Sequence, residues 1–78
     1  MRINSVEVPE MVIVSEGNTL YQFRFIDELS SSTEKLLTEI SSNDKLCTFW
    51  YCGADLEIDT NCAQITYLGS NQFYLEIL

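Results

Sequence analysis

Apolar residues along most of the chain follow the two-residue period of β-strands. The run LYQFRFI (20–26) places aromatic side chains on one face of a strand and polar side chains on the other. The preceding run EMVIVSE (10–16) is continuously apolar at its centre, which is typical of a strand covered on both faces. Gly17 and Asn18 lie between the two runs, and both tolerate a positive φ. The pattern therefore predicts a β-hairpin over residues 10–26.

Strands are also predicted on either side of this hairpin. RINSVEV (2–8) reads as a short edge strand, and Pro9 ends it because proline has no N–H to donate. Four further strands are predicted in the last third of the chain: LCTFWYC (46–52), DLEID (55–59), CAQITYL (62–68) and QFYLEIL (72–78). The turns expected between them are Gly53–Ala54, Thr60–Asn61 and residues 69–71.

One segment, residues 27–45, has helical spacing. Ser31 and Glu34 fit a capping box, in which the serine side chain accepts from an amide of the first turn and the glutamate reaches back. Asp27 is an alternative cap, so the start of the helix stays open between residues 27 and 32. Its apolar face consists of Leu36, Leu37 and Ile40, with Leu29 and Thr33 extending it upstream.

These elements predict a single α+β domain over residues 1–78. Its architecture is a small antiparallel sheet or partly closed barrel of six to seven strands with one helix, in the order β-β-β-α-β-β-β-β. One helix covers only part of one sheet face, whereas residues 11–14 and 46–52 are apolar on both parities. Either the sheet curls on itself or a second copy of the chain covers the remainder, as in a homodimer.

The charge of the chain is strongly one-sided. Twelve Asp and Glu residues oppose four Lys and Arg, there is no His, and the net charge is −8. Such a field repels nucleic acid and anionic membrane surfaces, so neither is expected to bind directly, and it attracts a basic protein partner. The alternative is that the charge only keeps a small apolar domain in solution.

The cysteines and the N-terminal sequence indicate a reducing compartment. Cys47, Cys52 and Cys62 are an odd number, unlike the even sets of disulfide-stabilised secreted domains. Residues 1–9 lack the pattern of a secretory leader, and no apolar run approaches the about 20 residues of a membrane span. We therefore expect a cytoplasmic protein with buried free thiols, and leave a Cys52–Cys62 bridge as an open alternative.

Asp55, Glu57 and Asp59 occupy alternate positions in GADLEIDTNC. Their spacing resembles a calcium loop only superficially, because Thr60 stands where that loop needs glycine and Thr66 where it needs a bidentate acid. The cysteines lack a fourth zinc ligand. With no His, no glycine-rich phosphate loop and no nucleophile elbow, neither an enzymatic activity nor a cofactor or metal is expected.

The alternating acids have two remaining interpretations. They are the wet face of a strand, or they form a surface of regularly spaced negative charge, with side chains repeating every ~6.6 Å. The helix acids Glu34 and Glu39 are candidates to extend such a surface. Aromatic anchors dominate protein interfaces, and the candidates here are Trp50 or Tyr51, and Tyr74.

The function expected from the sequence is protein binding. Its most concrete form is an acidic inhibitor that occludes the basic groove of a nucleic-acid-handling enzyme with carboxylates, such as a host-defence nuclease or a CRISPR or restriction effector. This is the strategy of nucleic-acid mimics of phage type. The alternatives are a homo-oligomeric structural or adaptor protein, and an immunity protein against a basic toxin.

Overall fold

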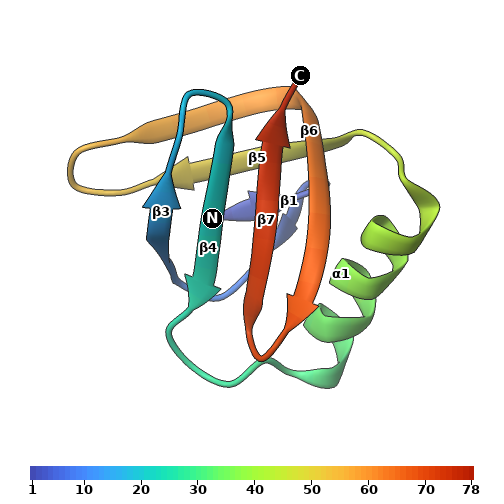
Figure 1. Ribbon diagram of the computed structural model, residues 1–78. Helices are drawn as coiled ribbons and strands as arrows, with labels where there is room; N and C mark the ends of the chain where they lie inside the picture. The colour runs from blue at the N-terminus through green and yellow to red at the C-terminus, as the bar shows by residue number, and fades with distance from the viewer.

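The computed structural model describes residues 1–78 and contains one helix and a seven-stranded antiparallel sheet (Figure 1). The elements in chain order are β1 (Arg2–Ile3), β2 (Val6–Glu7), β3 (Met11–Glu16), β4 (Leu20–Phe25), α1 (Ser31–Asn43), β5 (Cys47–Cys52), β6 (Glu57–Gly69) and β7 (Gln72–Ile77). The order of strands across the sheet is β2-β1-β5-β6-β7-β4-β3, and the sheet does not close. The predicted α+β class is confirmed.

β6 is a single strand of 13 residues that takes part in both halves of the sheet. The turn expected at Thr60–Asn61 is therefore wrong, and residues 55–59 and 62–68 are not two separate strands. Phe49 pairs with Thr60 and Cys47 with Ala63, so β6 carries one extra residue over this step. Such a β-bulge bends a strand and increases its twist. The chain thus changes direction at the predicted turn without leaving the sheet.

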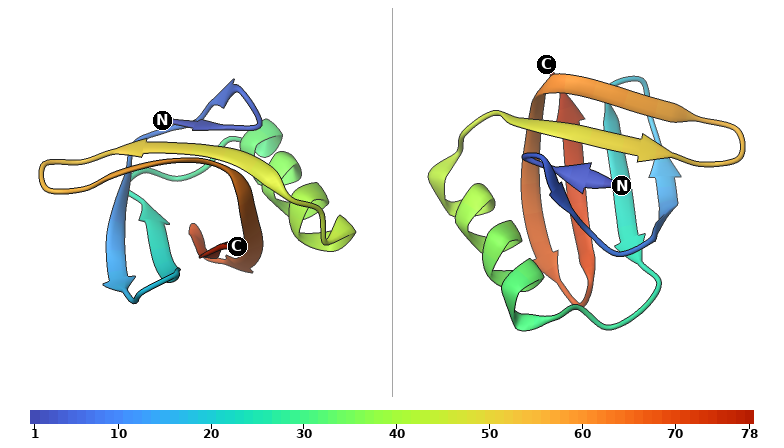
Figure 2. Two further views of the ribbon diagram at one scale, coloured as in Figure 1. Left: turned by 90° about the horizontal axis from the view of Figure 1, so that it is seen from above. Right: turned by 180° about the vertical axis from the view of Figure 1, so that it is seen from behind.

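The bend in β6 curls the sheet into two facing halves. Figure 2 shows β1, β2 and β5 on one side of the molecule and β3, β4 and β7 on the other, with β6 passing between them. β6 pairs with β5 through its first part and with β7 through its second. Of the two arrangements that the apolar pattern left open, the chain adopts the one in which the sheet covers itself.

An aromatic cluster fills the space between the two halves. Phe23 of β4 is fully buried at its centre. Its ring centroid lies 5.0 Å from that of Tyr51, 5.4 Å from that of Phe49 and 5.5 Å from that of Phe73. Aromatic pairs at such distances contribute about 0.5–1.5 kcal/mol each beyond the burial of their area. The alternating face predicted for residues 20–26 is confirmed as the middle of the core.

The N-terminal strand expected over residues 2–8 is instead a small hairpin. Asn4 and Ser5 have φ values of 51° and 64°, as a two-residue type I′ turn requires. Asn4 also docks on β5, because its amide donates to the Thr48 carbonyl at 2.9 Å and its Oδ1 accepts from the Thr48 amide at 3.1 Å. The pairing ends at Glu7, two residues before Pro9.

The hairpin predicted over residues 10–26 forms from β3 and β4, but two details of the prediction are wrong. Neither Gly17 nor Asn18 adopts a positive φ. The outer face of β3 is not covered, and Val14 is 49 % exposed. β3 is also an edge strand of the sheet. A bulge between Ile13 and Ser15 separates two registers with β4.

Of the other two turns predicted in the last third of the chain, one is wrong and one is confirmed. The two-residue turn expected at Gly53–Ala54 is wrong, because β5 and β6 are joined by residues 53–56, closed by a 2.9 Å hydrogen bond from the Gly53 amide to the Leu56 carbonyl. Gly53 is required by space, since a Cβ there would lie 2.5 Å from the Tyr51 hydroxyl. The turn at residues 69–71 is confirmed, and all three residues have positive φ.

The helix begins one residue earlier than the capping box predicted. Ser30 is the N-cap, and its Oγ accepts from the Thr33 amide at 3.3 Å. The expected partnership of Ser31 and Glu34 is therefore wrong, and Glu34 is free for another contact. α1 packs beside β6 with Leu37 and Ile40 buried. It ends at Asn43, within the range of residues 41–43 that the sequence predicts for its end.

Two hydrogen bonds attach the helix to β6, and both involve Tyr67. Its hydroxyl donates to Glu34 Oε2 at 3.0 Å, and its amide donates to Ser41 Oγ at 3.1 Å. Burial and the hydrogen bond to the Glu34 carboxylate raise the pKa of the Tyr67 phenol above its usual value of 10.0.

The three cysteines occupy different environments and are all free thiols. Cys47 is buried as expected, and burial raises the pKa of its thiol from 9.0 to about 11. Cys52 is exposed, so the expectation of burial is wrong for this residue. The alternative Cys52–Cys62 bridge is also excluded by the register, which pairs Cys52 with Glu57 and places Cys62 at the other end of the β5–β6 pair.

The one helix of the structure is too short and too polar to cross a membrane.

The thiols should react in the order of their exposure. With a chromogenic disulfide reagent at neutral pH, we expect Cys52 to react first, Cys62 more slowly and Cys47 only when the protein opens, because the reactive thiolate is suppressed at Cys47. Guanidinium-unfolded protein, in which the three thiols react together, serves as the control. A single rate for all three thiols in native buffer would contradict the placement of Cys47.

Neutralising Glu34 should lower the pKa of Tyr67. In Glu34→Gln we expect a phenol pKa closer to 10.0 but still above it, because burial is the larger cause of the shift and remains. NMR titration of the Tyr67 ring measures this, and Glu39→Gln on the same helix is the control. An unchanged pKa in Glu34→Gln would show that the hydrogen bond does not form in solution.

Candidate protein-binding site

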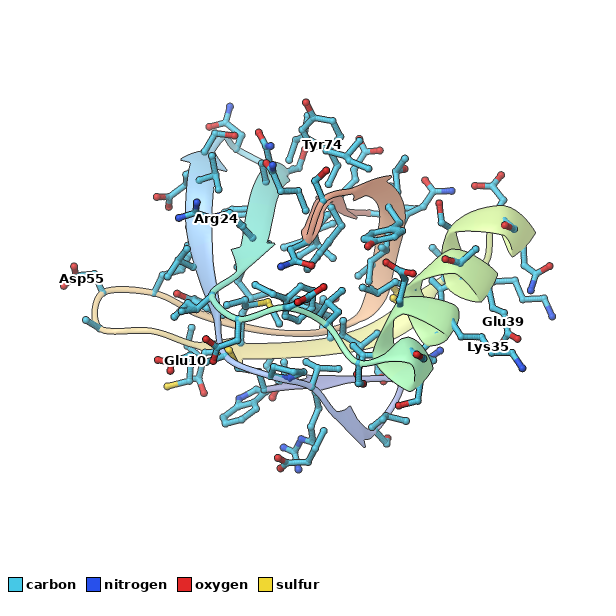
Figure 3. The ribbon with its side chains drawn as sticks, turned by 90° about the horizontal axis from the view of Figure 1, so that it is seen from below. Glu10, Arg24, Lys35, Glu39, Asp55 and Tyr74 are labelled. Atoms are coloured by element: carbon cyan, nitrogen blue, oxygen red, sulfur yellow. The ribbon has the colours of Figure 1, made fainter.

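The β5–β6 hairpin projects beyond the body of the sheet and carries the predicted acidic residues (Figures 1 and 2). Glu57 and Asp59 are exposed on the outer face of β6. Asp55 is not on the strand; it is in the connecting loop and lies at the tip of the hairpin (Figure 3). The predicted row of three thus becomes two carboxylates on a strand face and a third beyond its end.

Trp50 of β5 lies beside these carboxylates. It pairs in register with Asp59, and its Nε1 donates to Glu57 Oε2 at 3.1 Å. On the other side of β5, β1 brings the Arg2 guanidinium to 4.8 Å from the centroid of the Trp50 ring. At this distance the cation is attracted by the face of the indole. Trp50 is consequently held in one orientation and remains half-buried.

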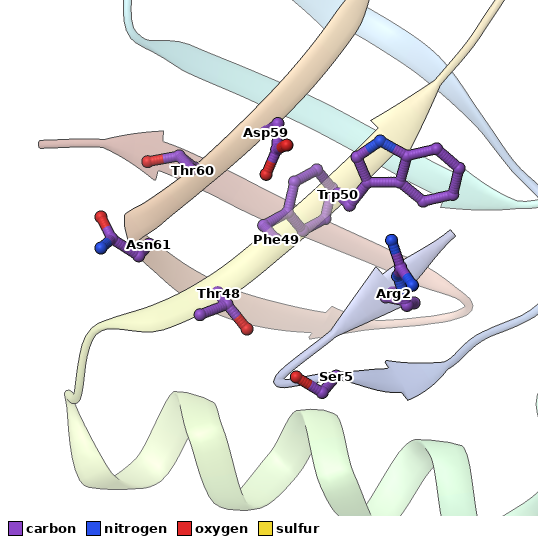
Figure 4. A pocket seen from close by; sticks show the side chains of 8 residues that line it. All are labelled: Arg2, Ser5, Thr48, Phe49, Trp50, Asp59, Thr60 and Asn61. Carbon is purple, nitrogen blue, oxygen red and sulfur yellow. The ribbon is translucent and has the colours of Figure 1, made fainter.

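A shallow hollow of about 580 Å³ opens next to Trp50 on this outer face (Figure 4). Its lining is mostly polar and includes Arg2, Thr48, Trp50, Asp59, Thr60 and Asn61. One cation and one carboxylate line it with several hydroxyl and amide groups. This chemistry suits the rim of a protein interface, where polar groups surround a central aromatic anchor.

Tyr51 is not available as an anchor. It is 7 % exposed, points to the opposite face from Trp50 and packs edge-on against Phe23. In the run Phe49–Tyr51, Trp50 therefore points to the outer face, and its two neighbours point to the core. Strand alternation requires only that Trp50 and Tyr51 point to opposite faces, and the packing of Tyr51 against Phe23 decides which of them is outside.

The remaining predicted residues lie elsewhere on the molecule. Tyr74 is 39 % exposed on the outer face of β7, in the half of the sheet opposite Trp50. Glu34 and Glu39 are on α1, at the far side of the molecule from Asp55 (Figure 3). The eight predicted residues do not form one surface. The structure brings together only Trp50, Glu57 and Asp59, with Asp55 nearby.

Arg2 is the residue of this surface that the sequence analysis missed. It lies 48 positions from Trp50 in the chain, and no local pattern connects the two. The contact exists because the Asn4–Ser5 turn allows β1 to pair with β5. The Asn4–Ser5 dipeptide was the one available signal of a hairpin there.

Three carboxylates of the structure accept hydrogen bonds from uncharged groups. Glu57 accepts from Trp50, Glu34 from Tyr67, and Asp44 from the Gln64 side chain. No Lys or Arg follows Lys45 in the sequence, so Arg2 supplies the positive charge near the hairpin. No three Cys, Asp or Glu side chains converge into a metal-binding group. The negative charge of the hairpin is therefore left for solvent or for a partner.

The fold and the site were compared with known proteins. No protein-family model, no curated protein and no solved structure matches this chain.

Proposed function

We propose that this protein binds and inhibits a nucleic-acid-handling enzyme by inserting its β5–β6 hairpin into the enzyme's basic groove. The observation that carries the proposal is the projecting hairpin itself, whose exposed carboxylates Asp55, Glu57 and Asp59 flank an oriented, half-buried Trp50. The hairpin has no Lys or Arg of its own.

The shape of the hairpin supports insertion rather than flat contact. The hairpin extends past β3 and past the body of the sheet (Figure 2). Its tip would therefore enter a groove of the partner enzyme that is too narrow for the rest of this molecule. Lys and Arg lining a nucleic-acid groove are spaced to meet phosphates, and carboxylates at strand spacing are able to meet them instead. The acidic charge would accelerate encounter, and Trp50 would supply the apolar contact.

The overall charge of −8 favours the same class of partner. The acids on the helix and on the N-terminal strands are distributed over other faces, and in this proposal they steer the partner without contacting it. Occupation of the groove excludes the enzyme's nucleic acid, so inhibition is competitive and needs no catalytic step by the inhibitor.

Neutralising the hairpin carboxylates should remove the binding. The triple variant Asp55→Asn, Glu57→Gln and Asp59→Asn is compared with the native protein as bait in a lysate of the source or its host, washed at low and high salt. We expect a basic nucleic-acid-binding enzyme to be retained by the native protein alone at low salt. With the purified enzyme, we expect affinity to fall about 100-fold, since three ion pairs contribute about 1 kcal/mol each.

A matched control variant distinguishes the effect of where the charges lie from the effect of the change in net charge. Asp27→Asn, Glu28→Gln and Glu76→Gln remove the same three charges from exposed positions outside the hairpin. This variant should keep most of the affinity, and added nucleic acid should compete with it as with the native protein. Equal losses in the two triple variants, or a captured enzyme that still binds nucleic acid in the complex, would refute groove occlusion.

Truncating Trp50 should weaken binding without unfolding the protein. In Trp50→Ala we expect a loss of about 2 kcal/mol or more, roughly 30-fold in affinity, because buried Trp anchors dominate interface energetics. The loss should persist at high salt, in contrast to that of the acidic triple variant. Far-ultraviolet circular dichroism checks that the sheet is retained. Unchanged affinity would mean that the anchor lies elsewhere.

A further inference from the structure

The open edge of β3 has main-chain groups that no other strand meets. β3 pairs with β4 alone, and it is the longer of the two strands at the sheet's edges. In an antiparallel pair, residues alternate between bonding to the partner and pointing both N–H and C=O away from it. The Ile26 amide donates to the Glu10 carbonyl and the Gly17 amide to the Leu20 carbonyl, which sets this alternation. The main-chain groups of Met11, Ile13 and Glu16 therefore face the open edge.

A groove runs beside this edge. It has a volume of about 310 Å³ and lies between β3 and the loop of the β5–β6 hairpin. Ile13, Tyr51 and Leu56 provide its apolar lining, and Glu16 and Asp55 provide carboxylates. A strand added to β3 would thus lie next to a hollow for its alternate side chains. Strand addition of this kind takes affinity from main-chain hydrogen bonds and specificity from such side-chain pockets.

The charges of the edge select against a second copy of the chain. In an antiparallel β3–β3 pair centred on Ile13, the bulge would set Glu16 of each copy opposite the apolar Met11 of the other, so neither carboxylate would meet a positive charge. Such a pair would also bring together two chains that each have a net charge of −8, which is unfavourable. Charged residues and bulges are also the devices by which proteins protect edge strands from self-pairing, and β3 has its bulge between Ile13 and Ser15. A strand that contains Lys or Arg would instead bring positive charges to the carboxylates beside this edge.

We propose that the β3 edge binds an extended segment of a partner protein that is apolar at its centre and carries Lys or Arg at its ends. The segment adds antiparallel or parallel to β3, places apolar side chains over Ile13, Tyr51 and Leu56, and directs its basic side chains to Glu16 and Asp55. The added strand occupies the opening that prevents the sheet from closing. This surface shares Asp55 with the proposed inhibitory site but contains neither Trp50 nor Glu57 nor Asp59, so the inference does not depend on the proposed inhibition.

A designed peptide tests the edge directly. The probe is acetyl-Lys-Thr-Val-Thr-Val-Thr-Lys-amide, whose Lys and Val side chains share one strand face, and its control has Glu in place of both Lys. Titrated into the ¹⁵N-labelled protein, the Lys peptide should shift the amides of Met11, Ile13 and Glu16 and of residues 53–56. Exchange of the Ile13 amide should slow about tenfold at ten times the Kd. The Glu peptide should cause neither effect.

A variant pair links the binding to the groove. Glu16→Gln with Asp55→Asn should weaken the Lys peptide about fivefold, as expected for two exposed ion pairs, and Glu28→Gln with Glu39→Gln should leave it unchanged. No shifts at millimolar Lys peptide would overturn the proposal. Shifts confined to the Trp50 indole and residues 57–60 would also overturn it, because they show charge attraction at the outer face. So would a dimer held through β3, detected as a doubled mass with the same protected amides.

Discussion

The bulge in β6 is the constraint on which the rest of the structure depends. Between the Phe49–Thr60 and Cys47–Ala63 pairs, β6 contains one residue more than β5, and the Thr60 hydroxyl accepts from the Cys62 amide at 3.1 Å. Because the strand bends there without breaking its pairing, one 13-residue strand bonds to β5 and then to β7. The two halves of the sheet then face one another, and a core forms that a flat sheet of this size would leave open to water.

The aromatic cluster and the candidate surface follow from this geometry. The curl of the sheet buries Phe23 among Phe49, Tyr51 and Phe73. Every second side chain of β5 therefore points into the core. The remaining side chains of β5 must point outward, so Trp50 lies on the convex face of the sheet together with Glu57. The same curl leaves the hairpin loop beyond the body of the sheet, and its end near β3 forms the groove beside the open edge. The core and the candidate surface around Trp50 are therefore formed by opposite faces of the same strands.

The electrostatics of the chain support the proposed encounter with a basic partner. Trp50, Tyr67 and Gln64 hold three of the carboxylates in place with neutral hydrogen bonds, so their positions are restrained while their charge is kept. Neutral donors do not cancel the field that steers a basic partner. The proposed inhibition uses one of these carboxylates, Glu57, at the outer face of the hairpin, whereas the β3-edge proposal uses Glu16 and Asp55. The two proposals also differ in whether side chains or main-chain groups make the decisive contacts.

The sequence by itself determined the α+β class, the 10–26 hairpin, the helix and its end, and the inward face of β4, because these follow from local periodicity. The tertiary structure decided what local patterns do not contain. It converted the expected turn at Thr60–Asn61 into a bulge, since pairing on both sides of β6 outweighs the turn preference of two residues. It also placed Trp50 on the surface and Tyr51 in the core. Strand alternation requires that the two point to opposite faces, but only the packing of Tyr51 against Phe23 decides which one is buried. It also brought Arg2 to Trp50 across 48 positions, a contact that depends on strand order rather than on any local motif.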